Sequence, residues 1–191
     1  MTGQNILDIL AISKRGPQVV MPKDAGIIIA YTGASPGWKV LDAGTGSGWL
    51  SMFLANIVKP GKVISYEKRP DFAKNVKEQI KRFGIKNLQV INKDIFEADV
   101  RGKFDLITLD MKDSDKILER LYKNLNNKGW IATYSPHIEQ VKSVNAAMIN
   151  LGLSDIKTVE NIIRDWKVDD FTHPIPSGIM HTGFMVFGRK C

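Results

Sequence analysis

The sequence contains very little cysteine, because Cys191 at its end is the only one among 191 residues. This count excludes an internal disulfide and a cysteine-based metal cluster, and it fits a reducing compartment. Apolar runs are also short: stretches such as residues 27–30 fall far below the roughly 20 residues that span a bilayer. Residues 1–10 lack the basic and apolar segments of a secretory signal. We therefore expect a soluble, cytoplasmic protein without a membrane partner.

Acidic residues are outnumbered by basic ones, which bears on the choice of partner. Lys and Arg number 27 against 20 Asp and Glu, so the formal net charge is +7 and the isoelectric point is near 9.4. Such a surplus favours a polyanion such as nucleic acid, although a basic enzyme with another substrate would carry the same charge. The length fits one α/β domain with a full hydrophobic core.

Hydrophobic periodicity predicts short buried strands that alternate with amphipathic helices. A helix is expected from Ser114, as its cap, through Leu125, with residues 127–129 as its terminator. Five alternations indicate an open parallel sheet with helices on both faces and a ligand crevice at the carboxyl ends of its strands. The other elements are expected as strands at 39–42, 62–66, 88–91, 104–109 and 130–134, and as helices at 6–12, 22–31, 50–58, 70–83 and 138–151.

The pattern changes beyond Leu153. Residues 158–168 and 182–188 are predicted to form two long strands, joined by the loop 169–181 with no helix between them. Such a pair gives the sheet an antiparallel edge. The prediction is thus an α/β fold whose seven-stranded sheet is mostly parallel, with an antiparallel last strand.

A glycine-rich turn follows the first predicted strand and leads into a helix. Its glycines, Gly44, Gly46 and Gly48, would let a ligand approach the backbone closely, and the amides at the helix start favour negative charge. The dinucleotide fingerprint requires a third glycine three positions after the second, where this chain has Trp49. The spacing therefore argues against a nicotinamide dinucleotide.

Acids follow four successive predicted strands. Asp42 ends the first and Glu67 the second, and Glu67 stands where nucleoside-binding α/β folds need a carboxylate for ribose hydroxyls. Asp94 and Asp110 follow the third and fourth strands, so all four acids are expected to face one crevice. Each could instead cap a loop by accepting backbone amides, and that alternative stays open.

These residues, together with the antiparallel edge, resemble a class I S-adenosylmethionine-dependent methyltransferase with a Rossmann-like fold. Further stretches resemble the tRNA (adenine-N1)-methyltransferase family, which acts on the T-loop adenine at position 58. The resemblance extends from Arg15 to Phe187. It is carried by residues 15–20, Pro22-Lys23-Asp24, residues 42–48, Thr108-Leu109-Asp110, Tyr134-Ser135-Pro136, Gln140-Val141 and His181-Thr182-Gly183-Phe184.

The resemblance implies a role for each matching residue. In the family, the aspartate after the fourth strand is catalytic, which falls on Asp110, and the tyrosine that falls on Tyr134 lines the same pocket. An aromatic ring there can stack on an extruded adenine. The alternative for Tyr134 is a tyrosine at the edge of the core with a satisfied hydroxyl. His173 and His181 are candidates for substrate contact, with ordinary loop histidines as the alternative; no metal site is expected. Contacts with S-adenosylmethionine are implied at Gln18, Val19, Asp42, Gly44, Thr45, Gly46, Ser47, Gly48, Glu67, Lys68, Asp94, Ile95 and Asp110.

The sequence departs from the family in two places. Members usually carry a small β-rich domain ahead of the catalytic one, whereas here residues 1–14 are expected to form only a short extension before a methyltransferase domain at 15–191. Members also tend to have an aromatic residue where this chain has Met21. The family assembles as homotetramers, so a homo-oligomer is implied, and a partner subunit is a second possible source of tRNA-binding surface.

Three functions are consistent with this pattern. The first is methylation of tRNA adenine, favoured by the net charge of +7 and the stretch 181–184. The second is methylation of a small molecule, as in the single-domain precorrin methylases of the cobalamin pathway, which also lack the β-rich domain. The third is a subunit that binds the cofactor without catalysing, and the retention of residues 42–48, Glu67 and Asp110 argues against it.

Overall fold

The computed structural model describes residues 5–16, 19–176 and 181–191. Helices and strands alternate through the first two thirds of the chain, as predicted. The helices are α1 (Ile6–Ile12), α2 (Pro22–Thr32), α3 (Trp49–Ile57), α4 (Pro70–Phe83), α5 (Ser114–Tyr122) and α6 (Ile138–Asn150). The strands are β1 (Lys39–Ala43), β2 (Lys62–Glu67), β3 (Leu88–Asn92), β4 (Phe104–Leu109), β5 (Leu125–Ser135), β6 (Ser154–Glu160), β7 (Trp166–Lys167), β8 (His173–Pro174) and β9 (Phe184–Arg189).

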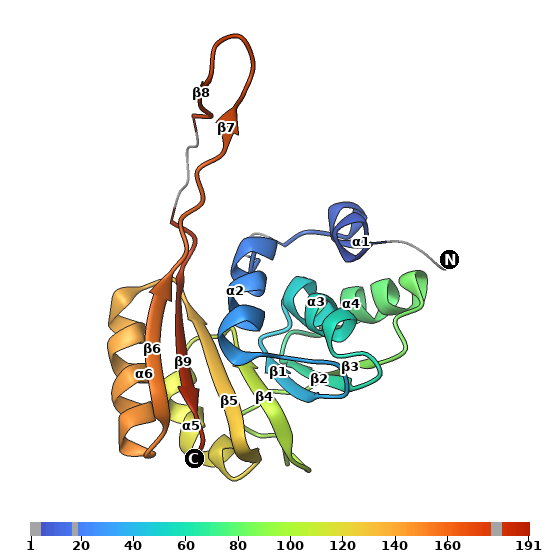
Figure 1. Ribbon diagram of the computed structural model, residues 1–191. Helices are drawn as coiled ribbons and strands as arrows, with labels where there is room; N and C mark the ends of the chain where they lie inside the picture. The colour runs from blue at the N-terminus through green and yellow to red at the C-terminus, as the bar shows by residue number, and fades with distance from the viewer. Residues whose placement is uncertain (1–4, 17–18, 177–180) are drawn as a thin grey trace.

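Seven of the strands form one sheet in the order β3-β2-β1-β4-β5-β9-β6 (Figure 1). The five strands from β3 to β5 are parallel, and β9 runs antiparallel to both β5 and β6. The predicted α/β fold with an antiparallel last strand is confirmed. The strand order reverses between β1 and β4, and open α/β sheets bind ligands outside the carboxyl ends of their strands at such a point.

Helices cover both faces of the sheet, as expected. The face that includes Val40 and Leu106 packs against α1 to α4, and the face that includes Leu41 and Ile107 packs against α5 and α6 (Figure 1). Alternate residues of β1 and β4 therefore enter different cores, because successive side chains of a strand point to opposite faces. The central strands are buried on both faces, which explains their continuous apolar runs.

The helix predicted to continue through Leu125 ends earlier, at Tyr122. Leu125 fits the helical spacing and is fully buried, but its backbone pairs with Phe104 at the start of β5. Ser114 does not cap the helix: it lies inside α5, and its hydroxyl donates to the carbonyl of Met111 over 2.6 Å. An apolar residue at this position can be buried equally well in a strand or on the face of a helix. Hydrophobic periodicity alone therefore could not distinguish the two structures for Leu125.

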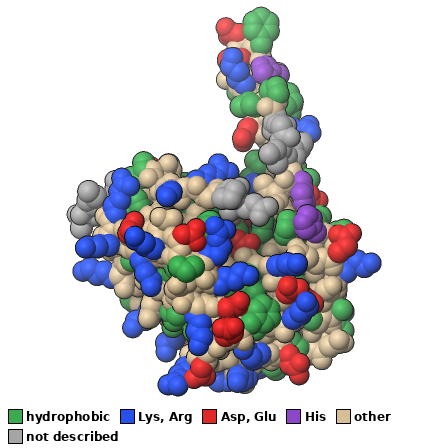
Figure 2. All heavy atoms as spheres, turned by 180° about the vertical axis from the view of Figure 1, so that it is seen from behind, with side chains coloured by type: hydrophobic (Ala, Val, Ile, Leu, Met, Phe, Trp, Pro, Cys, Tyr) green, Lys and Arg blue, Asp and Glu red, His purple; other side chains and the backbone are tan. Residues whose placement is uncertain are grey.

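The strand predicted at 158–168 was also wrong. β6 ends at Glu160, whose partner Phe184 is the first residue of β9, so no neighbour remains in the sheet beyond this point. The chain then leaves the domain as a protruding arm, described over residues 161–176 and at residue 181, in which β7 and β8 pair with each other (Figures 1 and 2). The arm exposes apolar side chains, with Val168 79% and Phe171 83% exposed.

Two features are absent from the described residues. No helix among them combines the length and the apolar character that a membrane span requires. The same residues contain no group of three or more His, Cys, Asp or Glu side chains placed to hold a metal ion.

Candidate active site

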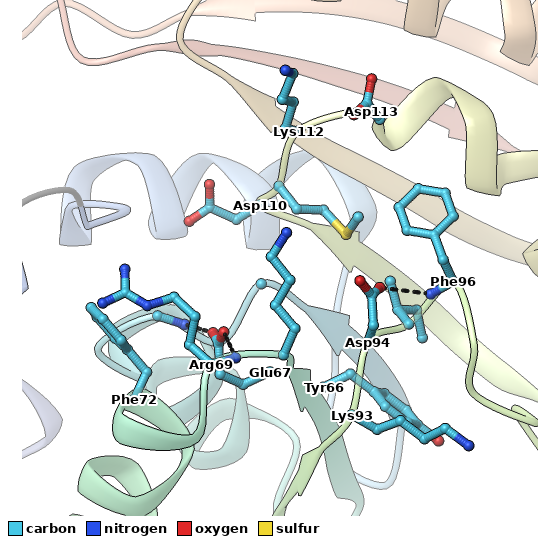
Figure 3. A pocket seen from close by; sticks show the side chains of 15 residues that line it. Tyr66, Glu67, Arg69, Phe72, Lys93, Asp94, Phe96, Asp110, Lys112 and Asp113 are labelled. Carbon is cyan, nitrogen blue, oxygen red and sulfur yellow. Dashed lines mark hydrogen bonds between the residues drawn. The ribbon is translucent and has the colours of Figure 1, made fainter.

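A cavity of about 400 Å³ lies at the carboxyl ends of the parallel strands. This volume falls within the range of roughly 300–1,000 Å³ that is typical of small-molecule sites. Three acids from the ends of three different strands surround it (Figure 3): Glu67 is the last residue of β2, and Asp94 and Asp110 follow β3 and β4. The lining residues are Gly44, Gly46, Tyr66, Glu67, Lys68, Arg69, Phe72, Lys93, Asp94, Ile95, Phe96, Asp110, Met111, Lys112 and Asp113.

Gly44 joins the glycine turn to the strand that carries Asp110. Its φ is +88°, and a Cβ there would lie 1.9 Å from the carbonyl oxygen of Asp110. The amide of Asp110 in turn donates to the carbonyl of Ala43 over 2.9 Å. Only a residue without a side chain allows the two segments to lie this close. The turn and the catalytic candidate therefore occupy fixed positions relative to each other.

Among the other residues of the glycine turn, one faces the cavity and the rest are packed into the protein. Gly46 lines the cavity, and its amide donates to Glu67 Oε2 over 2.8 Å. Gly48 faces α4 instead, because a Cβ there would lie 2.7 Å from a methyl group of Val76. Thr45 and Ser47 are buried, and neither is among the described residues that line the cavity. The predicted contacts of Thr45 and Ser47 with a cofactor would therefore have to be made from outside this lining.

Glu67 is held by the backbone on both of its carboxylate oxygens. Oε2 accepts from Gly46 and Oε1 accepts from the amide of Arg69 over 2.9 Å, and the side chain is only 6% exposed. Each carboxylate oxygen has more than one acceptor position, so a ligand hydroxyl can still donate to either. Glu67 can therefore accept backbone amides, as a loop cap does, and still accept a ligand hydroxyl, so the two roles considered from the sequence do not exclude each other.

Asp94 lies across the cavity from Glu67 (Figure 3), and the next residue, Ile95, also lines the cavity. Asp94 Oδ1 accepts from the amide of Phe96 over 2.9 Å, and the Phe96 ring is 37% exposed at the rim. From α5, the guanidinium of Arg120 donates to the carbonyls of Ile95 and Phe96. This contact fixes the loop that presents the carboxylate and the ring to the cavity.

Asp42 does not face the crevice, contrary to the sequence prediction. β1 continues through Ala43, and the register pairs Asp42 with Ser65 on β2 and Thr108 on β4. Both hydroxyls donate to its carboxylate, and the side chain is 1% exposed. Burial raises the pKa of Asp42, and the two hydrogen bonds oppose that rise. Asp42 braces three strands beneath the glycine turn.

Asp110 lines the cavity, and the pKa of its carboxyl is raised. Burial raises the pKa of its carboxyl from 3.8 to about 7, and the carboxylates of Asp42 and Glu67 add to the rise. A carboxyl with this pKa changes charge near neutral pH, which suits a group that exchanges a hydrogen bond or a proton with a substrate.

Tyr134 lies beside the strand that carries Asp110, since the preceding residue Thr133 pairs with Leu109. It does not appear among the described residues that line the cavity, contrary to the expectation that it shares that pocket. Its hydroxyl donates to the carbonyl of Thr182 over 2.5 Å, which holds the ring toward β9. Burial raises the pKa of this hydroxyl to about 12, so it remains a donor.

The two candidate histidines are not brought to the cavity. His173 lies on β8 in the arm, and His181 lies at the base of the arm, where Nδ1 is 2.6 Å from Glu160 Oε1. That hydrogen bond raises the pKa of His181. Val19 is partly buried away from the lining set, and Gln18 lies outside the described residues.

Comparison with known proteins identifies the family. Residues 7–182 match the family described as "tRNA methyltransferase complex GCD14 subunit". The chain belongs to this family. Along 96% of its length it is 38% identical to the tRNA (adenine(57)-N(1)/adenine(58)-N(1))-methyltransferase TrmI of Methanocaldococcus jannaschii, of which it covers 76%.

Solved structures of methyltransferases superpose on this GCD14 family member. The tRNA (m1A58) methyltransferase TrmI of Aquifex aeolicus superposes with a TM-score of 0.89 at 26% identity, over 98% of this chain and 76% of that one. A precorrin-6y C5,15-methyltransferase of Geobacter metallireducens superposes with a TM-score of 0.79 at 13% identity, over 93% of each chain. The second likeness shows the fold alone.

Several cavity residues of this GCD14 family member escaped the sequence analysis. Each lies within five residues of a predicted acid along the chain, because the loop that presents the acid also supplies the neighbouring wall. Proximity to a strand end was the signal that could have found them. They are Tyr66, Arg69, Phe72, Lys93, Phe96, Met111, Lys112 and Asp113.

Proposed function

We propose that this protein transfers a methyl group from S-adenosylmethionine to N1 of adenine 58 in the T-loop of tRNA. The observation that carries the proposal is the convergence of Glu67, Asp94 and Asp110 on one cavity, in a chain that matches the family over residues 7–182. The relative from M. jannaschii is named for N1 methylation of adenines 57 and 58, which supports the same class of product.

The cavity fits S-adenosylmethionine in its size and in its donors. The wall formed by Gly44 and Gly46 has no side chain, so the amino acid part of the cofactor could lie against the backbone. Glu67 would accept the ribose hydroxyls through its remaining acceptor positions, and Asp94 would accept from the adenine amino group. When bound, the cofactor supplies an activated methyl group on a sulfonium.

Asp110 is the residue to which we assign the chemistry. Alkylation of N1 spreads positive charge to the exocyclic amine of adenine, and a carboxylate that accepts from that amine binds it more tightly as the charge develops. Ionised Asp110 provides such an acceptor and could take the proton that the amine later loses. The remaining requirement is that N1 be held in line with the methyl group, which is a matter of positioning.

Tyr134 is proposed to contact the target adenine from the side of β5. A T-loop adenine must leave its stack to reach Asp110, and an extruded base is commonly held by an aromatic side chain. We also propose that His181 and His173 contact the RNA at the base and along the arm, where the side chains of both are exposed. Phosphate is the group on RNA that such exposed histidines would meet.

The arm supports assembly into a homo-oligomer, for which we propose the tetramer. Val168 and Phe171 are largely exposed on the arm, and apolar patches of this kind commonly mark association sites. Lys and Arg side chains are spread over the adjoining face of the domain (Figure 2). A surface with this charge suits tRNA, and a partner subunit would be a second way to extend it. The cytoplasm is the compartment proposed for this reaction.

The proposal is tested by incubating the purified chain with radiolabelled S-adenosylmethionine and unmodified tRNA, followed by nucleoside analysis of the digest. Label in 1-methyladenosine is expected, and it should be lost with tRNA in which adenine 58 is replaced by uridine. Asp110→Asn is the matched control for catalysis. Cofactor binding without transfer to tRNA would contradict the proposal and point to a small-molecule substrate or a required partner subunit.

A further inference from the structure

Outside the cavity, an ion pair lies in the first turn of α2 between Lys23, whose side chain is 17% exposed, and the buried Asp24. The Lys23 ammonium donates to Asp24 Oδ1 over 2.8 Å, to the hydroxyl of Thr182 over 2.8 Å and to the carbonyl of Asn161 over 2.6 Å. An ammonium has three N–H groups, so all of its donors are used. The Asp24 side chain is fully buried, and its second oxygen accepts from the hydroxyl of Thr182 over 2.8 Å.

This pair fastens both limbs of the arm to the domain. Asn161 directly follows β6 and Thr182 precedes β9, so the two residues form the base of the arm. The side-chain amide of Asn161 also donates to the carbonyl of Lys23 over 3.0 Å. The position of the arm base is therefore set by one lysine and one aspartate of α2.

The same base holds Tyr134. Its hydroxyl donates to the carbonyl of Thr182, and its ring lies against Gly183, where a Cβ would be 2.5 Å from the ring carbon Cζ. Tyr134 is the last residue but one of β5, which pairs with β4, and Asp110 directly follows β4. A continuous set of contacts thus runs from Lys23 through Thr182 to Tyr134, and its last member lies beside the catalytic carboxylate.

Stability alone is a weak reason for such a pair. A buried ion pair often contributes no more than apolar residues of the same volume, whereas it does demand one arrangement of the groups around it. Lys23 and Asp24 are not among the described residues that line the cavity.

We infer that Lys23 and Asp24 are positioning residues for methyl transfer: they hold Thr182, and through it Tyr134, beside Asp110. The inference rests on the proposed function and adds to it the residues that set the geometry of the adenine side of the site. It also makes the turnover rate depend on the position of the arm base.

The kinetic test compares Lys23→Met with Lys190→Met in the full-length chain. Lys190 is a matched control, because its ammonium also bridges elements, donating to the carbonyls of Tyr122 and Leu125 over 3.1 and 3.2 Å. Lys23→Met is expected to lower kcat for tRNA by about 10- to 100-fold, the effect of a misplaced reacting group, with the Kd for S-adenosylmethionine within about twofold of the native value. Lys190→Met should keep the native kcat.

A second set of variants separates positioning from folding. Lys23→Met leaves the Asp24 carboxylate without its partner, which could prevent folding. Thr182→Val keeps the shape and removes only the hydroxyl, and it should lower kcat in the same way. Combined with Tyr134→Phe, it should be no slower than the slower single variant, since the two substitutions break successive links of the same set of contacts from Lys23 to Tyr134. Additive losses, or an unchanged kcat in Thr182→Val, would overturn the inference.

The last measurement does not require activity. The chain has four tyrosines, so labelling with ¹³C at Cζ gives four resonances, and Tyr134→Phe identifies one of them. In Thr182→Val the Tyr134 resonance should shift or broaden, while those of Tyr66 and Tyr122 stay in place. An unmoved Tyr134 resonance would overturn the inference even if the chain methylates tRNA. A moved resonance in a chain that does not methylate tRNA would support the positioning and reject the proposed substrate.

Discussion

The carbonyl oxygen of Asp110 lies 1.9 Å from the point where Gly44 would carry a Cβ. The two residues directly follow the neighbouring strands β1 and β4 and are 66 positions apart in the chain, yet a side chain at Gly44 would displace the backbone of Asp110. This relationship links the wall on which a cofactor would lie to the carboxylate that would act on the substrate. It also gives the first prediction a direct steric basis.

Gly44→Ala is expected to abolish detectable binding of S-adenosylmethionine and to lower the melting temperature by several degrees. The added methyl group must push the backbone of Asp110 away, which distorts both walls of the cavity. Gly102→Ala is the matched control, because Gly102 has a similar φ of +93° with no atom within 4 Å of a Cβ. That control measures the cost of backbone strain alone, about 1–2 kcal/mol. Calorimetric titration with the cofactor would reveal native affinity in Gly44→Ala if this account were wrong.

The rate of methyl transfer should rise with pH through about 7, the value to which burial raises the pKa of Asp110. The sign follows from the role, since the ionised carboxylate is the form that accepts from the adenine amine. The pH profile of kcat/KM reports the free enzyme and should show one ionisation in this range. A flat profile between pH 6 and 8 would exclude Asp110 as the titrating acceptor.

Asp110→Asn should stabilise the protein above neutral pH while it removes activity. A raised carboxyl pKa means that the fold favours the protonated form, so this group's contribution to stability is present at low pH and is lost as pH rises from 3.8 toward about 7. The amide does not ionise, and its advantage in melting temperature should therefore grow from pH 5 to pH 8. Equal melting temperatures at both pH values would contradict the burial argument.

Glu67→Gln should weaken the binding of S-adenosylmethionine by at least about tenfold. The amide retains one acceptor oxygen, but its NH₂ group would face an amide donor of Gly46 or Arg69, and an unmatched buried donor typically costs about 1–3 kcal/mol. Glu78→Gln on the exposed face of α4 makes the same chemical change away from the cavity and should have no effect. Equal affinities in the two variants would remove Glu67 from the site.

Phe171→Asp should reduce the oligomeric mass of the protein, as measured by light scattering, without a change in its melting temperature at low concentration. Phe171 is 83% exposed in the arm, so the folded chain itself loses little from the substitution. Ile149→Asp on α6, at a side chain that is 60% exposed, is the control for an added charge at an exposed apolar position. An unchanged mass in Phe171→Asp would exclude the end of the arm from the association.

The sequence by itself determined the order of helices and strands as far as α6, the glycine turn, and three of the four acids predicted to face the cavity. Gly44, Glu67 and Asp110 could be found because each lies where a strand ends, and all parallel strands end at the same edge. Local patterns of this kind depend only on neighbours along the chain. The same reasoning explains why the bounds of α4 and β4 were predicted without error.

The tertiary structure alone decided which residues meet across strands. Asp42 does not face the cavity, because the register places its carboxylate between two hydroxyls of the neighbouring strands. β6 ends at Glu160, because its partner strand β9 begins at the residue that pairs with Glu160. The contact of Lys23 with Thr182 joins residues 159 positions apart. Pairing register and long-range hydrogen bonds depend on how all the strands of the sheet assemble. A short segment of sequence does not specify which residues of the neighbouring strand will pair with it.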